Sequence, residues 1–206
     1  KSQEADTPAA AGKVKVPWGP ILSIGLVLAS TYFIESSAAS WGAVYVRDTL
    51  GSTDAIAALA FGFYSFAMLL GRVSADFVIR RMGAGTVARA CAALAVAGTA
   101  LVVFAPVPAA AIAGFALAGF GLCVIAPLAF AAAGKIDEYG VAVARANSFT
   151  YVGFMLGAGI IGPVADLSTM RIAYAIPLVL SVVVLLNVGR IASNEPAHPA
   201  DSTAAA

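Results

Sequence analysis

The chain has 206 residues, of which 61% are hydrophobic and only 11% are charged, whereas a soluble domain carries about 25% charged residues. Its 12 basic and 11 acidic residues leave a formal net charge of +1, so it lacks the basic excess that binds nucleic acid. This composition excludes a soluble globular domain. It predicts an all-α protein that lies among membrane lipids and has no nucleic-acid partner.

Six apolar stretches follow one another along the chain. Each approaches the roughly 20 residues that an α-helix needs to cross a hydrocarbon core about 30 Å thick. We expect residues 1–17, which are polar and contain Ala, Pro and Lys, to form a cytoplasmic linker. Residues 18–190 form the predicted transmembrane domain, and the polar residues 191–206 a disordered cytoplasmic tail. The predicted spans are approximately residues 18–46, 55–70, 84–105, 109–133, 144–165 and 172–190.

The distribution of Lys and Arg predicts the orientation of these spans. If the N-terminus is cytoplasmic, the outer loops hold only Arg47 and Arg171, against ten basic residues in the inner segments. Inner loops of membrane proteins carry such an excess. We therefore expect a multi-pass protein of the cytoplasmic (inner) membrane with both termini in the cytoplasm. The inner basic residues are Lys1, Lys13, Lys15, Arg72, Arg80, Arg81, Arg89, Lys135, Arg145 and Arg190.

Glu35 is the one acidic residue deep within a predicted span, roughly 25 Å from the start of that span at 1.5 Å per residue. This count predicts a position in the outer part of the membrane. Such a group usually faces a bundle interior or an aqueous cavity. It either satisfies neighbouring serines near a helix break or forms a solute-binding or proton-coupling site. Trp41 and Tyr45 follow, and they either offer aromatic faces to a sugar-like solute or mark the membrane interface.

Asn147 and Tyr151 open the fifth span. They either line the inner mouth of a cavity or merely begin the helix. The predicted spans contain no His and only one deeply placed carboxylate, and the two cysteines match no metal-ligand spacing. We therefore expect neither an enzyme nor a cofactor or metal site.

Small and helix-breaking residues indicate how the spans pack. Gly153 and Gly157 have the four-residue spacing that lets two helices approach closely in a membrane. Pro127 and Pro163 are expected to kink or end their helices, because proline cannot donate the backbone hydrogen bond of a helix interior.

The most informative segment is the loop predicted after the second span, Gly71–Gly83. Asp76 lies four residues from both Arg72 and Arg80, so on a continuing helix all three would share a face. One interpretation is positive inner charge with one incidental acid. The other is a cytoplasmic latch, in which the acid pairs or caps in one conformation and is released in another.

This segment resembles the loop signature of the major facilitator superfamily, which has a glycine, an acid, flanking arginines and a downstream glycine. Two features depart from the strict signature. Phe77 stands where the family usually has a basic residue, and the spacing from Gly71 to Asp76 is one residue longer. Both departures suit the weaker copy that the family carries between helices eight and nine. The matching residues are Gly71, Asp76, Arg80, Arg81 and Gly83.

Three further segments, residues 35–45, 119–134 and 151–163, are similar to fucose-permease-like and uncharacterised inner-membrane transporters of that superfamily. The resemblance covers residues 18–190 and implies helices seven to twelve of a twelve-helix carrier. The start without Met then resembles the middle of a longer polypeptide, whose N-terminal six-helix half is the expected partner.

The resemblance implies a secondary transporter that moves a small polar solute, sugar-like among the candidates, by alternating access. It implies gating roles for Arg72, Asp76, Arg80 and Arg81. In the family the acid meets the N-terminal end of a helix from the other half, while the nearby arginines hold its carboxylate in place. The alternative is a six-helix structural or regulatory membrane subunit without its own transport activity.

Overall fold

The computed structural model describes residues 18–136 and 139–192. The predicted linker and most of the predicted tail lie outside the described residues, although the last helix continues to Ala192. Six helical units are long and apolar enough to cross a membrane, which confirms the predicted fold class. The elements are α1 (Trp18–Val44), the π-helical turn η1 (Tyr45–Thr49), α2 (Asp54–Met82), α3 (Ala84–Phe104), α4 (Pro108–Leu122), α5 (Ile125–Gly134), α6 (Val141–Leu167), α7 (Met170–Ala173) and α8 (Ala175–Ala192).

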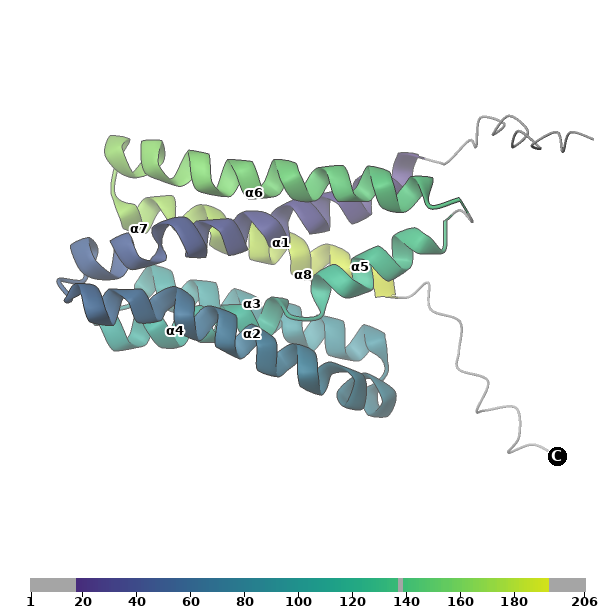
Figure 1. Cartoon of the computed structure of the whole chain (residues 1–206), viewed down its shortest axis with the longest axis horizontal. Coiled ribbons are helices and arrows are strands. Elements are labelled where there is room, and N and C mark those ends of the chain that lie inside the picture. Colours follow the sequence, from purple (N-terminus) through teal and green to yellow (C-terminus); the bar gives the residue numbers. More distant parts are fainter. Residues whose placement is uncertain (1–17, 137–138, 193–206) are drawn as a thin grey trace, which may run out of the picture.

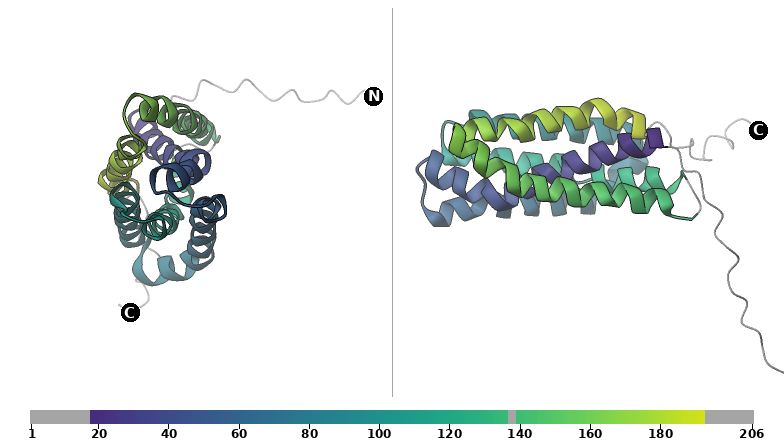
Figure 2. Two further views of the ribbon diagram at one scale, coloured as in Figure 1. Left: turned by 90° about the vertical axis from the view of Figure 1, so that its left-hand side faces the viewer. Right: turned by 90° about the horizontal axis from the view of Figure 1, so that it is seen from above.

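The helices lie side by side in an elongated bundle (Figure 1). Helices α6, α1, α5 and α2 form the side that faces the viewer, which we call the front face, and α3 and α8 lie behind them (Figures 1 and 2). The spans that begin with α1 and α4 are the most buried of the six. They form the centre of the bundle, and the other spans pack around them.

The segment Gly71–Gly83 is helical up to Met82, so the predicted loop is wrong. Its charged residues do not interrupt the helix, because they follow the apolar part of α2 and extend toward the end of the bundle. Arg80 and Arg81 lie in the last turn, where positive charge complements the helix dipole. Only Gly83 connects α2 to α3. Its φ of 78° and ψ of 145° define a backbone conformation that is strained for residues with a side chain.

Two spans are broken shortly before a proline. The fourth span divides at Cys123 and Val124, and Pro127 follows four residues after Cys123. The sixth divides at Tyr174, just after Ala173, which lies four residues before Pro177. In both places the proline ring would clash with the carbonyl four residues back in a continuous helix. The first break fits the kink predicted near Pro127, and the second was not predicted.

Pro163 behaves differently, because it lies inside α6, which continues to Leu167. This proline therefore does not end its helix. It removes one backbone hydrogen bond near the end of α6, where the following turn still forms.

Helices α1 and α6 pack through the glycine pair predicted from its spacing. A side chain at Gly153 would meet the backbone of Ala29, and one at Gly157 would meet the backbone of Phe33. The Ser36 hydroxyl donates a hydrogen bond of 2.7 Å to the carbonyl of Phe154. Small residues and a polar contact together hold these helices close, as is common where lipid supplies no hydrophobic driving force.

Candidate functional site

The outward surface of α2 has two stripes: one carries polar residues together with the exposed Leu69, and we call it the polar stripe. Ser65, Arg72 and Asp76 are seven and four residues apart, so they follow one side of the helix, and Ser65, Arg72 and Asp76 are all exposed. A second exposed stripe is entirely apolar. Because charged groups within a membrane face an aqueous cavity or a bundle interior, we assign the polar stripe to a cavity and the apolar stripe to lipid. The apolar stripe contains Phe63, Phe66, Leu70, Val73 and Phe77.

Glu35 lies near the middle of the longest span. It follows Trp18 by seventeen residues and precedes Thr49 by fourteen, because the helix continues through η1. Its position in the outer part of the membrane stays a prediction. Glu35 is half-buried, while Ala39 and Ala43 on the following turns are exposed. These small side chains leave open space above the carboxylate.

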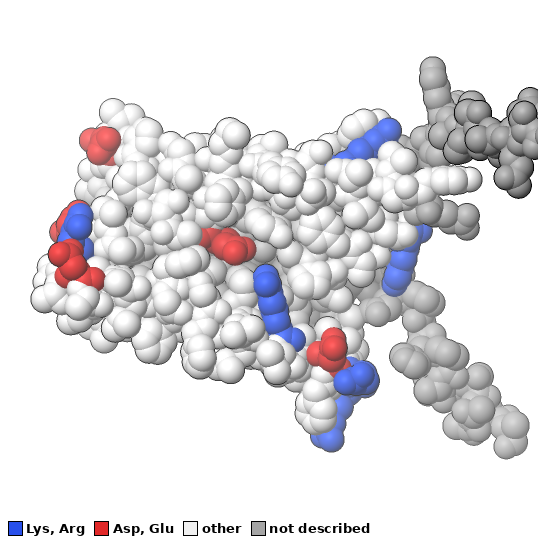
Figure 3. Space-filling view, in the orientation of Figure 1, with Lys and Arg blue, Asp and Glu red and all other residues white. Residues whose placement is uncertain are grey.

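Glu35 and Arg72 approach each other from neighbouring helices. Side chains lean toward the N-terminus of their own helix, and α1 and α2 run in opposite directions. Glu35 therefore leans toward the level of Arg72, and Arg72 toward the level of Glu35. Figure 3 shows an acidic side chain over the middle of α1 and a basic side chain over α2 whose tip points toward it. Arg72 is also the charged residue that acts electrostatically on Glu35.

The two charges influence each other without forming an ion pair. In the described part of the chain, the ion pairs join Arg47 to Asp48 at 2.6 Å and to Asp54 at 3.5 Å, at the end of the bundle. A charge within a membrane without a close partner is costly, so these two charges at mid-face indicate a functional site.

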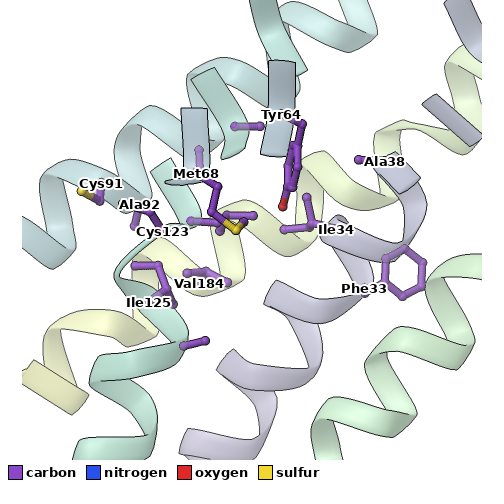
Figure 4. Packing of buried hydrophobic residues seen from close by; sticks show 14 of the residues in the cluster. Phe33, Ile34, Ala38, Tyr64, Met68, Cys91, Ala92, Cys123, Ile125 and Val184 are labelled. Atoms are coloured by element: carbon purple, nitrogen blue, oxygen red, sulfur yellow. The ribbon is translucent and has the colours of Figure 1, made fainter. Parts of the chain in front are cut away.

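Tyr64 is a third polar residue between α1 and α2, and the sequence analysis did not identify it. It is 1% exposed, and its hydroxyl has no hydrogen-bond partner among the described residues. Figure 4 shows the hydroxyl directed toward Ile34, the neighbour of Glu35 in α1. Both Glu35 and Arg72 act on it electrostatically. The sequence feature that could have indicated Tyr64 is its hydroxyl group, which stands in a phenylalanine-rich helix eight residues before Arg72.

Trp41 and Tyr45, the two aromatic candidates, hold helices together in this half. The Trp41 indole nitrogen donates to the carbonyl of Ala158 in α6 at 2.8 Å. The Tyr45 hydroxyl donates to the carbonyl of Val102 in α3 at 2.7 Å, and the Tyr45 side chain is fully buried. The polar atoms of Trp41 and Tyr45 are therefore both occupied by bonds to other helices and are not free to bind a solute beside Glu35.

Asn147 and Tyr151 lie one turn apart on α6. The Asn147 side-chain oxygen accepts a hydrogen bond of 3.4 Å from the Thr150 hydroxyl, and Tyr151 is 69% exposed. Helix α6 packs on α1 and α5, and its Gly153 approaches the backbone of α1. These two candidates therefore lie on α6, a different helix from Arg72, and their role in a cavity stays a prediction.

Two of the four proposed gating residues border a hollow of about 380 Å³ between α2 and the break before α5. Arg72 and Asp76 line it from α2, and Cys123 and Pro127 line it from the broken span. Neither Arg72 nor Arg80 forms an ion pair with Asp76 in the described residues. The expectation that these arginines hold the carboxylate in place is therefore not met in this conformation.

Arg81 has a different partner, because its guanidinium lies 4.5 Å from the centre of the Phe77 ring. This cation–π contact uses the phenylalanine that departs from the family signature. Asp76 itself stays exposed on the polar stripe, where its carboxylate is open to a partner from another helix bundle.

Residues 21–206 of the chain match the sequence profile of the Major Facilitator Superfamily. The chain belongs to this superfamily. It is 34% identical over 163 residues to the uncharacterised transporter y4wD of Sinorhizobium fredii, an alignment that covers 78% of this chain and 43% of that protein. It is also 28% identical to an uncharacterised MFS-type transporter of Yersinia pestis, over 77% of this chain and 42% of that protein.

A third relative is the membrane protein MosC of Rhizobium meliloti, which is 27% identical over 71% of this chain and 36% of its own length. The chain thus spans less than half the length of these curated relatives. Its six spans are consistent with half of a major facilitator fold, and the superfamily consists of transporters rather than enzymes.

Proposed function

We propose that this chain is the C-terminal half of a secondary transporter, which moves a small polar solute across the cytoplasmic membrane by alternating access. The observation that carries the proposal is the polar stripe of α2 beside Glu35. On the front face, Glu35 lies near the middle of its helix and Arg72 on the neighbouring helix, and exposure of either charge to lipid would be costly. A second six-helix half over this face would enclose both residues in an aqueous cavity.

The orientation belongs to the same proposal. The end of the bundle that holds Gly83 carries most of the basic residues, and we assign it to the cytoplasm. Both termini are then cytoplasmic, and Asp76 lies at the cytoplasmic end of the cavity, where it would act as a gate with Arg72, Arg80 and Arg81.

The solute-binding part of the proposal depends on Glu35 and Arg72 more than on the aromatic residues. Trp41 and Tyr45 carried the expectation of a sugar-like solute, but their polar atoms already bond to neighbouring helices. Asn147 and Tyr151 remain candidates for the opposite wall of the cavity on α6.

Cysteine accessibility tests alternating access. In the full-length carrier, Cys91 and Cys123 are replaced by alanine, and Ser65→Cys is compared with Phe66→Cys. Both positions are exposed in this half, and Phe66 is 57% exposed, but only Ser65 lies on the polar stripe. A membrane-impermeant thiol reagent should label Ser65→Cys from either side of the membrane and leave Phe66→Cys unlabelled.

Labelling of Ser65→Cys from one side only would contradict alternating access. Equal labelling at both positions would contradict the division of α2 into cavity and lipid stripes. A six-helix structural or regulatory subunit, the second candidate, predicts that neither position is labelled from both sides.

A further inference from the structure

Three polar groups between α1 and α2 have no hydrogen-bond or ion-pair partner among the described residues. They are the Glu35 carboxylate, the Arg72 guanidinium and the buried Tyr64 hydroxyl. Buried polar groups are nearly always satisfied, and charges in a membrane are usually paired. Of the three, only the Tyr64 hydroxyl is buried, whereas Glu35 is half-buried and Arg72 is exposed. The two charges are therefore open to a group from outside this half, which in the enclosed cavity is the other half or a bound solute.

The charges of this site select the chemistry of its ligand. We propose that the transported solute is a zwitterion of the amino-acid type, with its cationic group at Glu35 and its anionic group at Arg72. This inference rests on the proposed transport function and names the solute class for the same cavity. Tyr64 is too buried to meet the solute directly from the front face. It faces α1 beside Glu35 (Figure 4), so we assign it a positioning role behind the carboxylate.

Other solute classes fit this pair of charges less well. A monovalent cation attracted by Glu35 would be repelled by Arg72, and a monovalent anion would meet the opposite conflict. A sugar would supply no charge to either residue, so each charge would have only the other, at more than ion-pair distance, to compensate it in a site of low dielectric constant. A solute that carries both charges compensates both residues and adds no net charge to the cavity.

The structure also gives such a solute room. The side chains that follow Glu35 along the open side of α1 are Ala39 and Ala43, which are small and exposed. On the other side, Arg72 borders the hollow of about 380 Å³ in front of the break before α5. Arg72 and Asp76 line this hollow and Glu35 does not. Small-molecule sites commonly have volumes of about 300–1,000 Å³, so the hollow gives room beside Arg72 for the anionic end of a small amino acid.

Thermal unfolding of the purified full-length carrier in detergent tests the proposal. The probes are the twenty standard L-amino acids, glycine betaine, glucose and fucose. For each amino acid that raises the melting temperature, two analogues are compared: the amide, which lacks the carboxylate, and the 2-hydroxy acid, which lacks the ammonium group. We expect at least one zwitterion to stabilise the carrier and both of its analogues to bind at least tenfold more weakly.

Charge-neutralising variants then assign each end of the solute. Glu35→Gln should abolish the preference for the zwitterion over its 2-hydroxy acid, because only Arg72 still selects. Arg72→Gln should abolish the preference for the zwitterion over its amide. Arg145→Gln is the matched control, since Arg145 stacks on Trp18 at 4.7 Å, away from this site, and it should bind like the wild type. Melting temperatures without ligand show whether each variant is folded.

Four results would overturn the zwitterion proposal: stabilisation by a sugar alone, equal binding of a zwitterion and its singly charged analogues, unchanged selectivity in both variants, or no stabilisation by any probe. None of these four results contradicts alternating access if Ser65→Cys is still labelled from both sides of the membrane. If a zwitterion binds but Ser65→Cys is not labelled from both sides, the result contradicts the proposed transport and still supports the proposed binding site.

Discussion

Replacement of Gly157 by alanine tests the close contact between α1 and α6. The added methyl group would lie 3.0 Å from the carbonyl carbon and the Cα of Phe33 and closer still to its oxygen, and these are backbone atoms that cannot rotate away. Overpacking of this kind costs about 1–3 kcal/mol. Separation of the helices would also stretch the hydrogen bonds that Ser36 and Ser37 donate to α6, at a cost of about 0.5–1.5 kcal/mol each.

The matched control is Gly159→Ala in the same helix, because a methyl group there meets no atom within 4 Å. Both substitutions gain about 1 kcal/mol of helix propensity, so this gain cancels when the two variants are compared. We therefore expect Gly157→Ala to be less stable than Gly159→Ala by about 2–6 kcal/mol. The measurement is reversible denaturant unfolding of the full-length carrier in micelles. Equal stability of the two variants would refute the argument.

Two further predictions concern orientation and gating. Reporter fusions after Arg47 should read as external and fusions after Arg81 as internal, and an external signal at Arg81 would overturn the proposed topology. Asp76→Asn should leave the amount of assembled carrier nearly unchanged, because Asp76 is exposed and has no ion-pair partner in the described residues. It should shift the carrier toward the cytoplasm-open state, because a carboxylate at a helix N-terminus contributes about 0.3–2 kcal/mol, and about 1.4 kcal/mol changes an equilibrium tenfold. Cavity-cysteine labelling that is the same in both proteins on both sides would contradict the gating role.

The number, type and order of the spans could be predicted, because a membrane requires long apolar helices and the sequence keeps its charges away from most of them. The break before α5 was also expected from Pro127. The break at Tyr174 has the same cause, since Pro177 lies at the equivalent distance from it, and the same argument would have found it. The end of α2 differs from the predicted loop, because charged residues mark the end of the apolar part of a span and a helix can continue beyond it.

The candidate site was less accessible to prediction. Glu35 could be identified, because a single acid within an apolar span is conspicuous in the sequence. Its relation to Arg72 depends on how two separate helices align along their axes, and no periodicity within either helix contains that information. Trp41 and Tyr45 have the residue types of a binding surface, but their rotation about α1 directs them toward the backbones of α6 and α3.

Within the signature segment Gly71–Gly83, the glycine at the one-residue connection and the acid Asp76 are needed for different reasons. The chain must reverse between α2 and α3 through a backbone conformation that only glycine adopts without strain, and this requirement exists whether or not the protein ever changes state. Asp76 has no comparable role in holding this half together. A homologue that has lost the acid but kept the glycine would therefore have kept the hairpin and lost the gate that we propose for Asp76.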